Sequence, residues 1–220
     1  MTGAWRRQRL ARARLYLCVD RRAEQGDLEA FLDEVVGAGV DLVQLRDKTA
    51  RRSQLRAAAE VFLQVARCYG ALFIVNDDPD LAVQVNADGV HVGQDDPPPY
   101  QARALVGPDR LVGRSTHTLA EIDRALTEDC DYFAVGPVHA TPTKQGRPGV
   151  GLEPLRHAAA VAGDRPWFVT GAMSMATAPE ALTAGASRLV VVRAIAQAAE
   201  PAVVTRALAG LLQRGPPAGR

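Results

Sequence analysis

The sequence predicts a single-domain α/β protein, a closed (β/α)8 barrel of the TIM type. Three observations predict this fold: short apolar runs alternate with helix-length segments, the alternation occurs eight times, and polar residues follow the apolar runs. Runs of about four β-branched and aromatic residues are too short for helices and fit strands that are buried on both faces. Eight such units favour a closed barrel over an open doubly wound sheet.

The barrel is expected over residues 15–212, and no linker divides it. Residues 1–14 form an Arg-rich N-terminal extension, frayed or helical, without the apolar core of a signal peptide. Residues 213–220 form a flexible Pro/Gly-rich tail. Strands are expected at residues 15–19, 42–45, 72–75, 89–92, 111–114, 132–135, 167–170 and 188–192, the first clear helix at 27–36 and the last helix at 194–212.

Four similar segments support this repeat. Each one closes a helical pattern with a small or turn-forming residue and opens a strand, as at the αβ junction of a βα unit. The segments are Gly39–Gln44, Asn86–His91, Asp129–Ala134 and Gly185–Val190.

Composition narrows the classes of partner. The formal net charge of +1 argues against nucleic acid, and no apolar run approaches the roughly 20 residues of a membrane span. Cys18, Cys68 and Cys130 show no paired spacing, so they indicate reduced, buried thiols of a cytoplasmic protein. Small molecules remain as partners, and the sequence leaves a homo-oligomer open.

Two acids mark the ends of neighbouring strands. Asp77 follows the apolar run 72–75 and Asp96 follows the run 90–92. Because parallel strands end at one edge, the two carboxylates are expected to be neighbours, and they repel unless a cation lies between them. Oxygen ligands favour Mg²⁺. The alternative is an N-cap, which we favour for Asp78 because Pro79 follows it.

Cations cluster at the same edge. Alternation after the second strand sends Gln44, Arg46 and Lys48 to one side, where they would face an anion. A salt bridge from Arg46 to a barrel carboxylate is the alternative. Lysine occurs only at Lys48 and Lys144, which suits two phosphate contacts in a chain that otherwise uses Arg, although chance remains an alternative.

Three further strand exits suit phosphate binding. The segment 136–151 is long for a βα loop, and we expect it to act as a lid, with Thr141, Thr143 and Lys144 as phosphate ligands. As composition alone this is weak, because Thr-Pro and Gly-Pro also make turns. The exits at residues 170–174 and 191–194 bring Gly171 and Arg193, which implies a second phosphorylated ligand.

The four histidines show no metal-like spacing. We expect His91 in the core or behind the site, and His157 on the surface. His117 and His139 flank the expected site and could hydrogen-bond a substrate.

Together these segments resemble the thiamine-phosphate synthase family from Leu15 to about Ala198. The resemblance rests on Val43–Lys48, Val75–Asp78, Ala87–Asp96, Gly113–Thr118, and Gly136–Val138 with Thr141–Lys144. It implies a (β/α)8 barrel that joins a pyrimidine-methyl diphosphate to a thiazole phosphate with Mg²⁺, releasing pyrophosphate.

By position, the resemblance implies a set of site residues. Catalytic roles fall to Ser115, Lys144 and Lys48, and Mg²⁺ to Asp77 and Asp96. Pyrimidine diphosphate contacts fall to Gln44, Arg46, Lys48 and Asn76, with Asp47 at a position that is often Glu in relatives. Thiazole phosphate contacts fall to Thr141, Thr143, Gly171, Ala172, Val192 and Arg193. Relatives often have Gly at 172 and Ser at 193, so we expect altered contacts to this phosphate without loss of function.

The residues suit a dissociative substitution, because leaving-group charge needs cations more than it needs a base. Two alternatives are a thiazole tautomerase of the same barrel family and a non-catalytic barrel that binds thiazole or thiamine phosphate. Paired acids with two lysines argue against the tautomerase, which has no diphosphate to neutralise.

Overall fold

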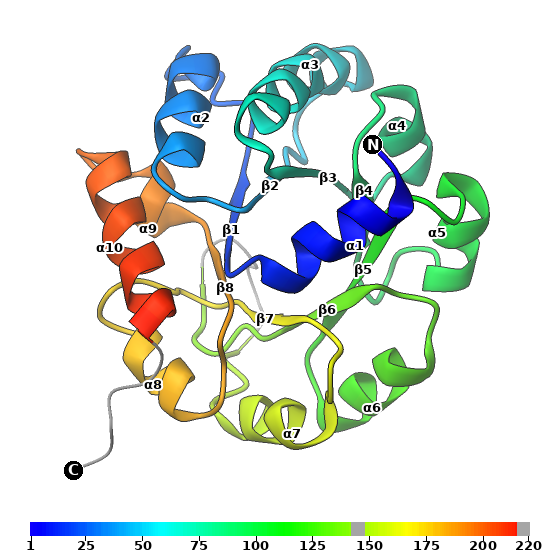
Figure 1. The fold of residues 1–220 in the computed structure, drawn as a ribbon, viewed down its shortest axis with the longest axis vertical. Coiled ribbons are helices and arrows are strands. Elements are labelled where there is room, and N and C mark those ends of the chain that lie inside the picture. The colour runs from blue at the N-terminus through cyan, green and yellow to red at the C-terminus, as the bar shows by residue number, and fades with distance from the viewer. Residues whose placement is uncertain (142–147, 215–220) are drawn as a thin grey trace.

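The computed structural model describes residues 1–141 and 148–214, and it confirms the predicted (β/α)8 barrel (Figure 1). All eight strands are parallel, they pair in chain order, and β8 closes onto β1. The strands are β1 (Leu15–Val19), β2 (Leu42–Leu45), β3 (Leu72–Asn76), β4 (Gly89–Val92), β5 (Leu111–Thr116), β6 (Tyr132–Val135), β7 (Trp167–Val169) and β8 (Leu189–Val191).

Strands β1, β2, β4 and β6 match the predicted ranges residue for residue. Strand β5 runs two residues longer, because Ser115 and Thr116 still pair with β6 although their side chains are polar. Strands β7 and β8 are shorter, since they share a single register pair, Val169 with Leu189.

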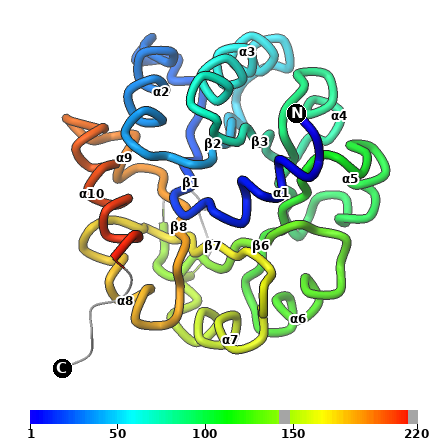
Figure 2. Tube along the Cα trace, in the orientation of Figure 1, coloured from blue at the N-terminus to red at the C-terminus, as the bar shows by residue number. Residues whose placement is uncertain are grey.

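The helices form a ring outside the strands (Figure 2). In the barrel repeat they are α2 (Leu28–Gly37), α3 (Arg52–Tyr69), α4 (Pro79–Gln84), α5 (Pro99–Val106), α6 (Leu119–Thr127), α7 (Glu153–Val161), α8 (Ala178–Thr183), α9 (Arg193–Ala196) and α10 (Pro201–Arg214). The expectation of one last helix over 194–212 was wrong. Residues 197–200 separate α9 from α10, which begins at a proline that suits the first turn of a helix.

Helix α1 (Gly3–Arg12) lies across one end of the barrel instead of joining the ring (Figures 1 and 2). Its residue Leu10 and the following Ala13 are buried against side chains that point into the lumen, including Leu42, Leu72 and Leu111. Each of these leucines begins its strand, so α1 closes the N-terminal end of the barrel.

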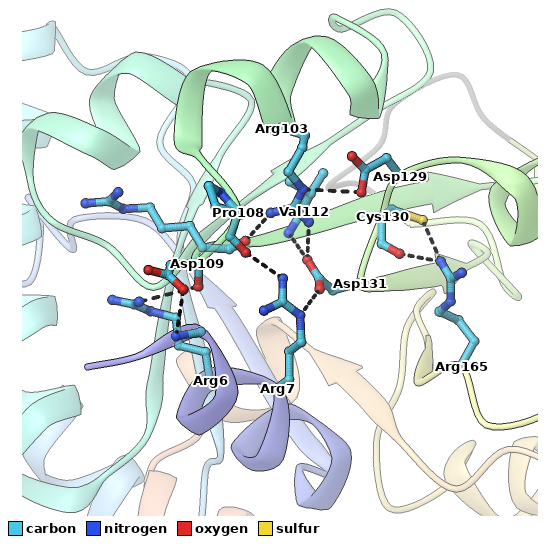
Figure 3. Close-up of polar contacts among 12 residues, drawn as sticks. Arg6, Arg7, Arg103, Pro108, Asp109, Val112, Asp129, Cys130, Asp131 and Arg165 are labelled. Carbon is cyan, nitrogen blue, oxygen red and sulfur yellow. Dashed lines mark hydrogen bonds and ion pairs between the residues drawn. The ribbon is translucent and has the colours of Figure 1, made fainter.

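Arginines of α1 fix this closure (Figure 3). Arg6 is buried, and its Nε lies 2.8 Å from Asp88 Oδ1. The other Asp88 oxygen accepts from Phe73 N at 3.1 Å, so one carboxylate joins the helix to β3. Arg7 from α1 and Arg103 from α5 reach the two oxygens of Asp131 at 2.9 and 2.5 Å.

The core has two layers, as a barrel requires. Outward-facing residues of every strand pack against the helices, while inward-facing residues fill the lumen. Three rings, Tyr16, Tyr132 and Phe168, meet edge to face at the centre of the lumen, with centroids 5.4 to 6.1 Å apart. Among the described residues, α1 and these three rings therefore fill the lumen from its N-terminal end to its centre.

Within residues 1–141 and 148–214, no helix combines the length and apolar character that crossing a bilayer requires.

We expect Asp88→Asn to lower the free energy of unfolding by about 3 to 5 kcal/mol, because the buried Arg6 loses its countercharge. Urea unfolding measures the change. The double variant Arg6→Met/Asp88→Asn is the control: it removes both charges and should regain much of the loss. A loss below about 1 kcal/mol in the single variant would show that this pair does not hold α1.

Candidate active site

Two adjoining cavities open at the C-terminal ends of the strands. The first, here named the central cavity, has a volume of about 220 Å³. On one side it is lined by Gln44, Arg46, Asn76 and Ser115, and on the other by Thr141, Gly171, Ala172, Val192 and Arg193. Nine of the residues predicted from the sequence thus meet around one space.

The second, here named the acidic cavity, has a volume of about 240 Å³. Lys48, Asp77 and Asp96 line it with the loop that follows β4. Arg46, Asn76, His91 and Ser115 line both cavities. A ligand with one part in each cavity would therefore pass these four side chains.

The acid pair lies together at the rim, although 19 positions separate its members in sequence. Burial raises the pKa of Asp77, the neighbouring Asp96 carboxyl raises it further, and Lys48, whose Nζ is 3.5 Å from Asp77 Oδ2, opposes the rise. Asp96 Oδ2 accepts from Gly93 N at 2.7 Å. Two like charges are held close, and a cation between them would relieve their repulsion.

The backbone conformation at Asp77 turns its side chain towards Asp96. Its φ is 63°, a left-handed conformation that Asp adopts more readily than most residues. Its N–H donates to His91 O at 2.8 Å and so ties the turn to β4. Asp78, next in sequence, accepts from Leu81 N at 2.8 Å, which confirms its interpretation as the N-cap of α4.

The loop that carries Asp96 is braced from β5. Arg114 is buried and donates through Nη1 to Gly93 O at 2.6 Å. Gln94 donates to Ser115 O at 2.6 Å and accepts from Arg114 and Arg124. These contacts hold the loop against β5. The position of Asp96 opposite Asp77 therefore does not depend on any attraction between the two carboxylates.

The donor set fits Mg²⁺ as a bound metal. Mg²⁺ is commonly held by one or two protein carboxylates and completes its coordination with water and phosphate. Among residues 1–141 and 148–214, no three His, Cys, Asp or Glu side chains gather as a metal cluster.

Gln44 and Ser115 are held by buried partners. Gln44 Nε2 donates to Tyr16 Oη at 2.6 Å, and Ser115 Oγ lies 2.9 Å from His91 Nε2. His91 is buried, as expected for a core residue, but it also lines both cavities. In the part of the chain that the structure describes, Arg46 makes no ion pair, so the alternative salt bridge is not formed there and its charge faces the cavities.

The segment after β7 lies very close to the backbone at Pro137 and Val138. Gly171 has φ 114°, and a Cβ atom there would lie 2.2 Å from Val138 N. Ala172 follows with φ 54°, a left-handed conformation that costs an alanine about 1 kcal/mol or more. The chain thus keeps an alanine where the resemblance expects glycine, and both residues still line the central cavity.

Several expected residues lie elsewhere. Thr143 and Lys144 fall outside the described residues, as do residues 142–147 of the expected lid 136–151. Asp47 lines neither cavity: it accepts from Thr49 and Ala50 and pairs with Arg21 at 3.1 Å. Burial works to raise the pKa of Asp47, but these hydrogen bonds and Arg21 outweigh it, so the pKa lies below its usual value.

Of the remaining histidines, one lines a cavity and two do not. His117 lines the acidic cavity and contacts Gly136 O through Nδ1. His139 lies 2.5 Å from Glu180 and lines neither cavity, and the partly exposed His157 lies 2.6 Å from Asp123.

Sequence reasoning missed Tyr16, Cys18 and Met173, which line the central cavity. For Tyr16 and Cys18 a signal existed, because alternation along β1 sends both inward. Met173 had none.

Comparisons with known proteins show the family of this chain. The family model described as thiamine monophosphate synthase matches residues 15–195. A thiamine-phosphate synthase of Acidothermus cellulolyticus is 52% identical over 194 residues, which cover 88% of this chain and 92% of that protein. One of Mycolicibacterium vanbaalenii is 48% identical over 214 residues, covering 93% and 96%.

Among solved structures, a thiamine phosphate pyrophosphorylase from Pyrococcus furiosus superposes with a TM-score of 0.83 at 28% identity, covering 93% of this chain and 98% of that one. A 3-hexulose-6-phosphate synthase from Salmonella typhimurium superposes with a TM-score of 0.64 at 18% identity, covering 91% and 99%, which shows the barrel fold alone.

We expect Gly171→Ala to destabilise the protein by roughly 3 kcal/mol, because its φ is unfavourable and its Cβ would displace the backbone at Val138. Gly163→Ala is the matched control: its φ is also positive, at 54°, but nothing lies within 4 Å, so only about 1 kcal/mol should be lost. Thermal unfolding compares the two. Equal stability losses in the two variants would mean that the close contact between Gly171 and Val138 does not contribute to the effect.

Proposed function

The chain belongs to the thiamine monophosphate synthase family and acts as a transferase that forms thiamine phosphate, and we propose how its two cavities divide the two substrates. The diphosphate of the pyrimidine substrate lies in the acidic cavity, and its ring lies in the central cavity. The thiazole phosphate enters the central cavity from the side of β7 and β8. The observation that carries this proposal is that Arg46, Asn76, His91 and Ser115 line both cavities.

The diphosphate is bound by charge. Lys48 and Arg46 supply two cations that face the acidic cavity. Asp77 and Asp96 would hold Mg²⁺, which would supply positive charge to the leaving diphosphate. Asp47 acts indirectly in this proposal, because its contacts shape the turn between Arg46 and Thr49.

The pyrimidine ring is bound by hydrogen bonds. Gln44 presents its amide to the central cavity while Tyr16 fixes one amide hydrogen. Asn76 and Ser115 lie where the two cavities join. These uncharged groups can recognise ring nitrogens and an amino group without competing for the diphosphate.

The thiazole phosphate is placed at the opposite wall. Gly171 and Ala172 offer backbone amides, Val192 an apolar surface, and Arg193 a charge. Thr141 borders the same space. By resemblance Thr143 contacts this phosphate too, and Lys144 the departing diphosphate; both lie outside the described residues. Arg193 keeps the wall cationic where relatives often have Ser.

The reaction is a dissociative substitution. The bond between the methylene carbon and the diphosphate oxygen breaks, and its electron pair stays with the oxygen. The aminopyrimidine supports the positive charge at the methylene until the lone pair of the thiazole nitrogen attacks it. Lys48, Arg46 and the Ser115 hydroxyl stabilise the leaving group, which is where charge develops.

We also propose a cytoplasmic location without nucleic acid as a partner. The three cysteines are free thiols, which agrees with a reducing compartment. Cys18 and Cys130 are buried as expected, but the expectation of a buried thiol was wrong for Cys68, which is exposed at the end of α3. The tautomerase and carrier alternatives give no reason to hold Asp77 and Asp96 together beside Lys48.

Incubation with both substrates and Mg²⁺ should release one pyrophosphate for each thiamine phosphate formed, and neither substrate alone should release it. EDTA should abolish both products, because the acid pair cannot bind the diphosphate without a cation. A coupled pyrophosphate assay with chromatography measures them. Binding without pyrophosphate release would favour the tautomerase or the carrier, and turnover that persists in EDTA would contradict the metal site.

We expect Asp77→Asn to abolish Mg²⁺-dependent turnover yet raise the melting temperature of the metal-free protein at neutral pH. The pKa of Asp77 is raised in the folded state, so the stability that this carboxyl contributes is fully present below its unfolded pKa of 3.8 and is lost as pH rises through its folded pKa. Asn removes that loss, and it tolerates the φ of 63°, which makes it a cleaner test than Ala.

Thermal melting from acid to neutral pH, with and without Mg²⁺, measures this effect. Mg²⁺ should stabilise the wild type and not the variant. The control Asp164→Asn, in the exposed turn after α7, should change neither property. A variant that melts below the wild type at neutral pH would show that the Lys48 contact outweighs the repulsion.

A further inference from the structure

The polar side chains beneath the central cavity form one continuous chain of hydrogen bonds. It starts at Gln44 on β2, crosses the lumen through two tyrosine hydroxyls and ends at Ser115 on β5. The steps are Gln44 Nε2 to Tyr16 Oη (2.6 Å), Tyr16 Oη to Tyr132 Oη (3.1 Å), Tyr132 Oη to His91 Nδ1 (3.2 Å) and His91 Nε2 to Ser115 Oγ (2.9 Å).

Strand register and one glycine make the middle of this chain possible. His91, Gly113 and Tyr132 are register partners on β4, β5 and β6. A Cβ atom at Gly113 would lie 2.5 Å from His91 Nδ1 and 2.2 Å from the Tyr132 ring. Because β5 has no side chain at this level, the imidazole and the hydroxyl meet across it.

The Gln44 amide, at one end of this series of hydrogen bonds, fixes the direction of donation. Gln44 Nε2 is an amide nitrogen and can only donate, so Tyr16 accepts from it. The thiol of Cys18, 3.1 Å from Gln44 Oε1, donates to the other end of the same amide and supports this orientation. Burial raises the pKa of both tyrosines far above the usual range, so each hydroxyl keeps its one proton.

One arrangement of the remaining protons uses every hydroxyl as a donor, either within this series of hydrogen bonds or into the cavities. Tyr16 donates to Tyr132, and Tyr132 donates to Nδ1 of His91. The neutral imidazole therefore carries its proton on Nε2 and donates it to Ser115 Oγ. The hydroxyl proton of Ser115 is left to donate into the cavities, both of which this residue lines.

We propose that Tyr16, Tyr132 and His91 are positioning residues that hold Ser115 as a hydrogen-bond donor to the diphosphate oxygen that receives the electron pair. This inference rests on the proposed placement of the diphosphate. Ser115 stands at the junction of the two cavities, where the breaking carbon–oxygen bond lies. A donor fixed at that oxygen stabilises the transition state more than the bound substrate, because charge grows there as the bond breaks.

Tyr132→Phe keeps the ring and removes the hydroxyl at the centre of the chain. We expect kcat to fall about tenfold while KM for both substrates stays within about twofold, since the interaction is made in the transition state. Tyr69→Phe is the control: it loses a hydroxyl contact to Asp33 on the surface, away from both cavities, and should match the wild type.

A double-variant comparison separates positioning from a general loss of packing. If Tyr132 acts through Ser115, then Ser115→Ala/Tyr132→Phe should be no slower than Ser115→Ala alone. A fully additive loss overturns the proposal, and so does a Tyr132→Phe variant with unchanged kcat. His91→Gln keeps a donor nitrogen near the Nε2 position and should retain more activity than His91→Leu.

The tautomer offers a readout that is independent of turnover. In ¹⁵N spectra of histidine-labelled wild type, the His91 ring, assigned with His91→Gln, should carry its proton on Nε2. A proton on Nδ1 would reverse the chain and overturn the proposal even in an active enzyme. A wild type that releases no pyrophosphate would instead refute the proposed function, and the inference with it.

Discussion

The lumen of the barrel has room for few side chains, and the inward-facing residues of eight strands must share it. At the N-terminal end, leucines of three strands and Leu10 of α1 fill it. At the centre, the Tyr16, Tyr132 and Phe168 rings fill it edge to face. Strand β5 accommodates them by having Gly113 at that level. This packing constraint governs the site, because the buried hydroxyls need partners and find them in residues of the cavity wall.

The two ends of the barrel therefore do different work. Ion pairs lie at the closed end: Arg6 pairs with Asp88, and both Arg7 and Arg103 pair with Asp131. The open end holds charges that are poorly compensated in the protein alone, above all Asp77 beside Asp96. Contacts that stabilise the fold are thus kept apart from contacts that await a ligand, as is common in barrels of this type.

The sequence was sufficient for the barrel because its strands are short, apolar and regularly spaced, and four of them were placed residue for residue. It was also sufficient to bring Asp77 and Asp96 together, since parallel strands end at one edge. It was insufficient where tertiary contacts decide. The carboxylate of Asp47 turns into its own loop, which alternation cannot reveal. Met173 reaches the cavity through a turn with two positive φ angles, and the chain from Gln44 to Ser115 depends on register across five strands.

Left-handed backbone conformations occur at the wall of each cavity, at Asp77 in the acidic cavity and at Ala172 in the central cavity. Asp77 after β3 and Ala172 after β7 are non-glycine residues with positive φ, at 63° and 54°. Such conformations persist only where the surroundings enforce them. Here the Asp77 N–H bonds to His91 O, and Thr177 Oγ1 donates to Ala172 O at 2.9 Å. Each turn is thus tied to a neighbouring segment before any ligand binds. A substitution that weakens either hydrogen bond would therefore change the geometry of ligand binding, even where the substituted residue does not itself contact a ligand.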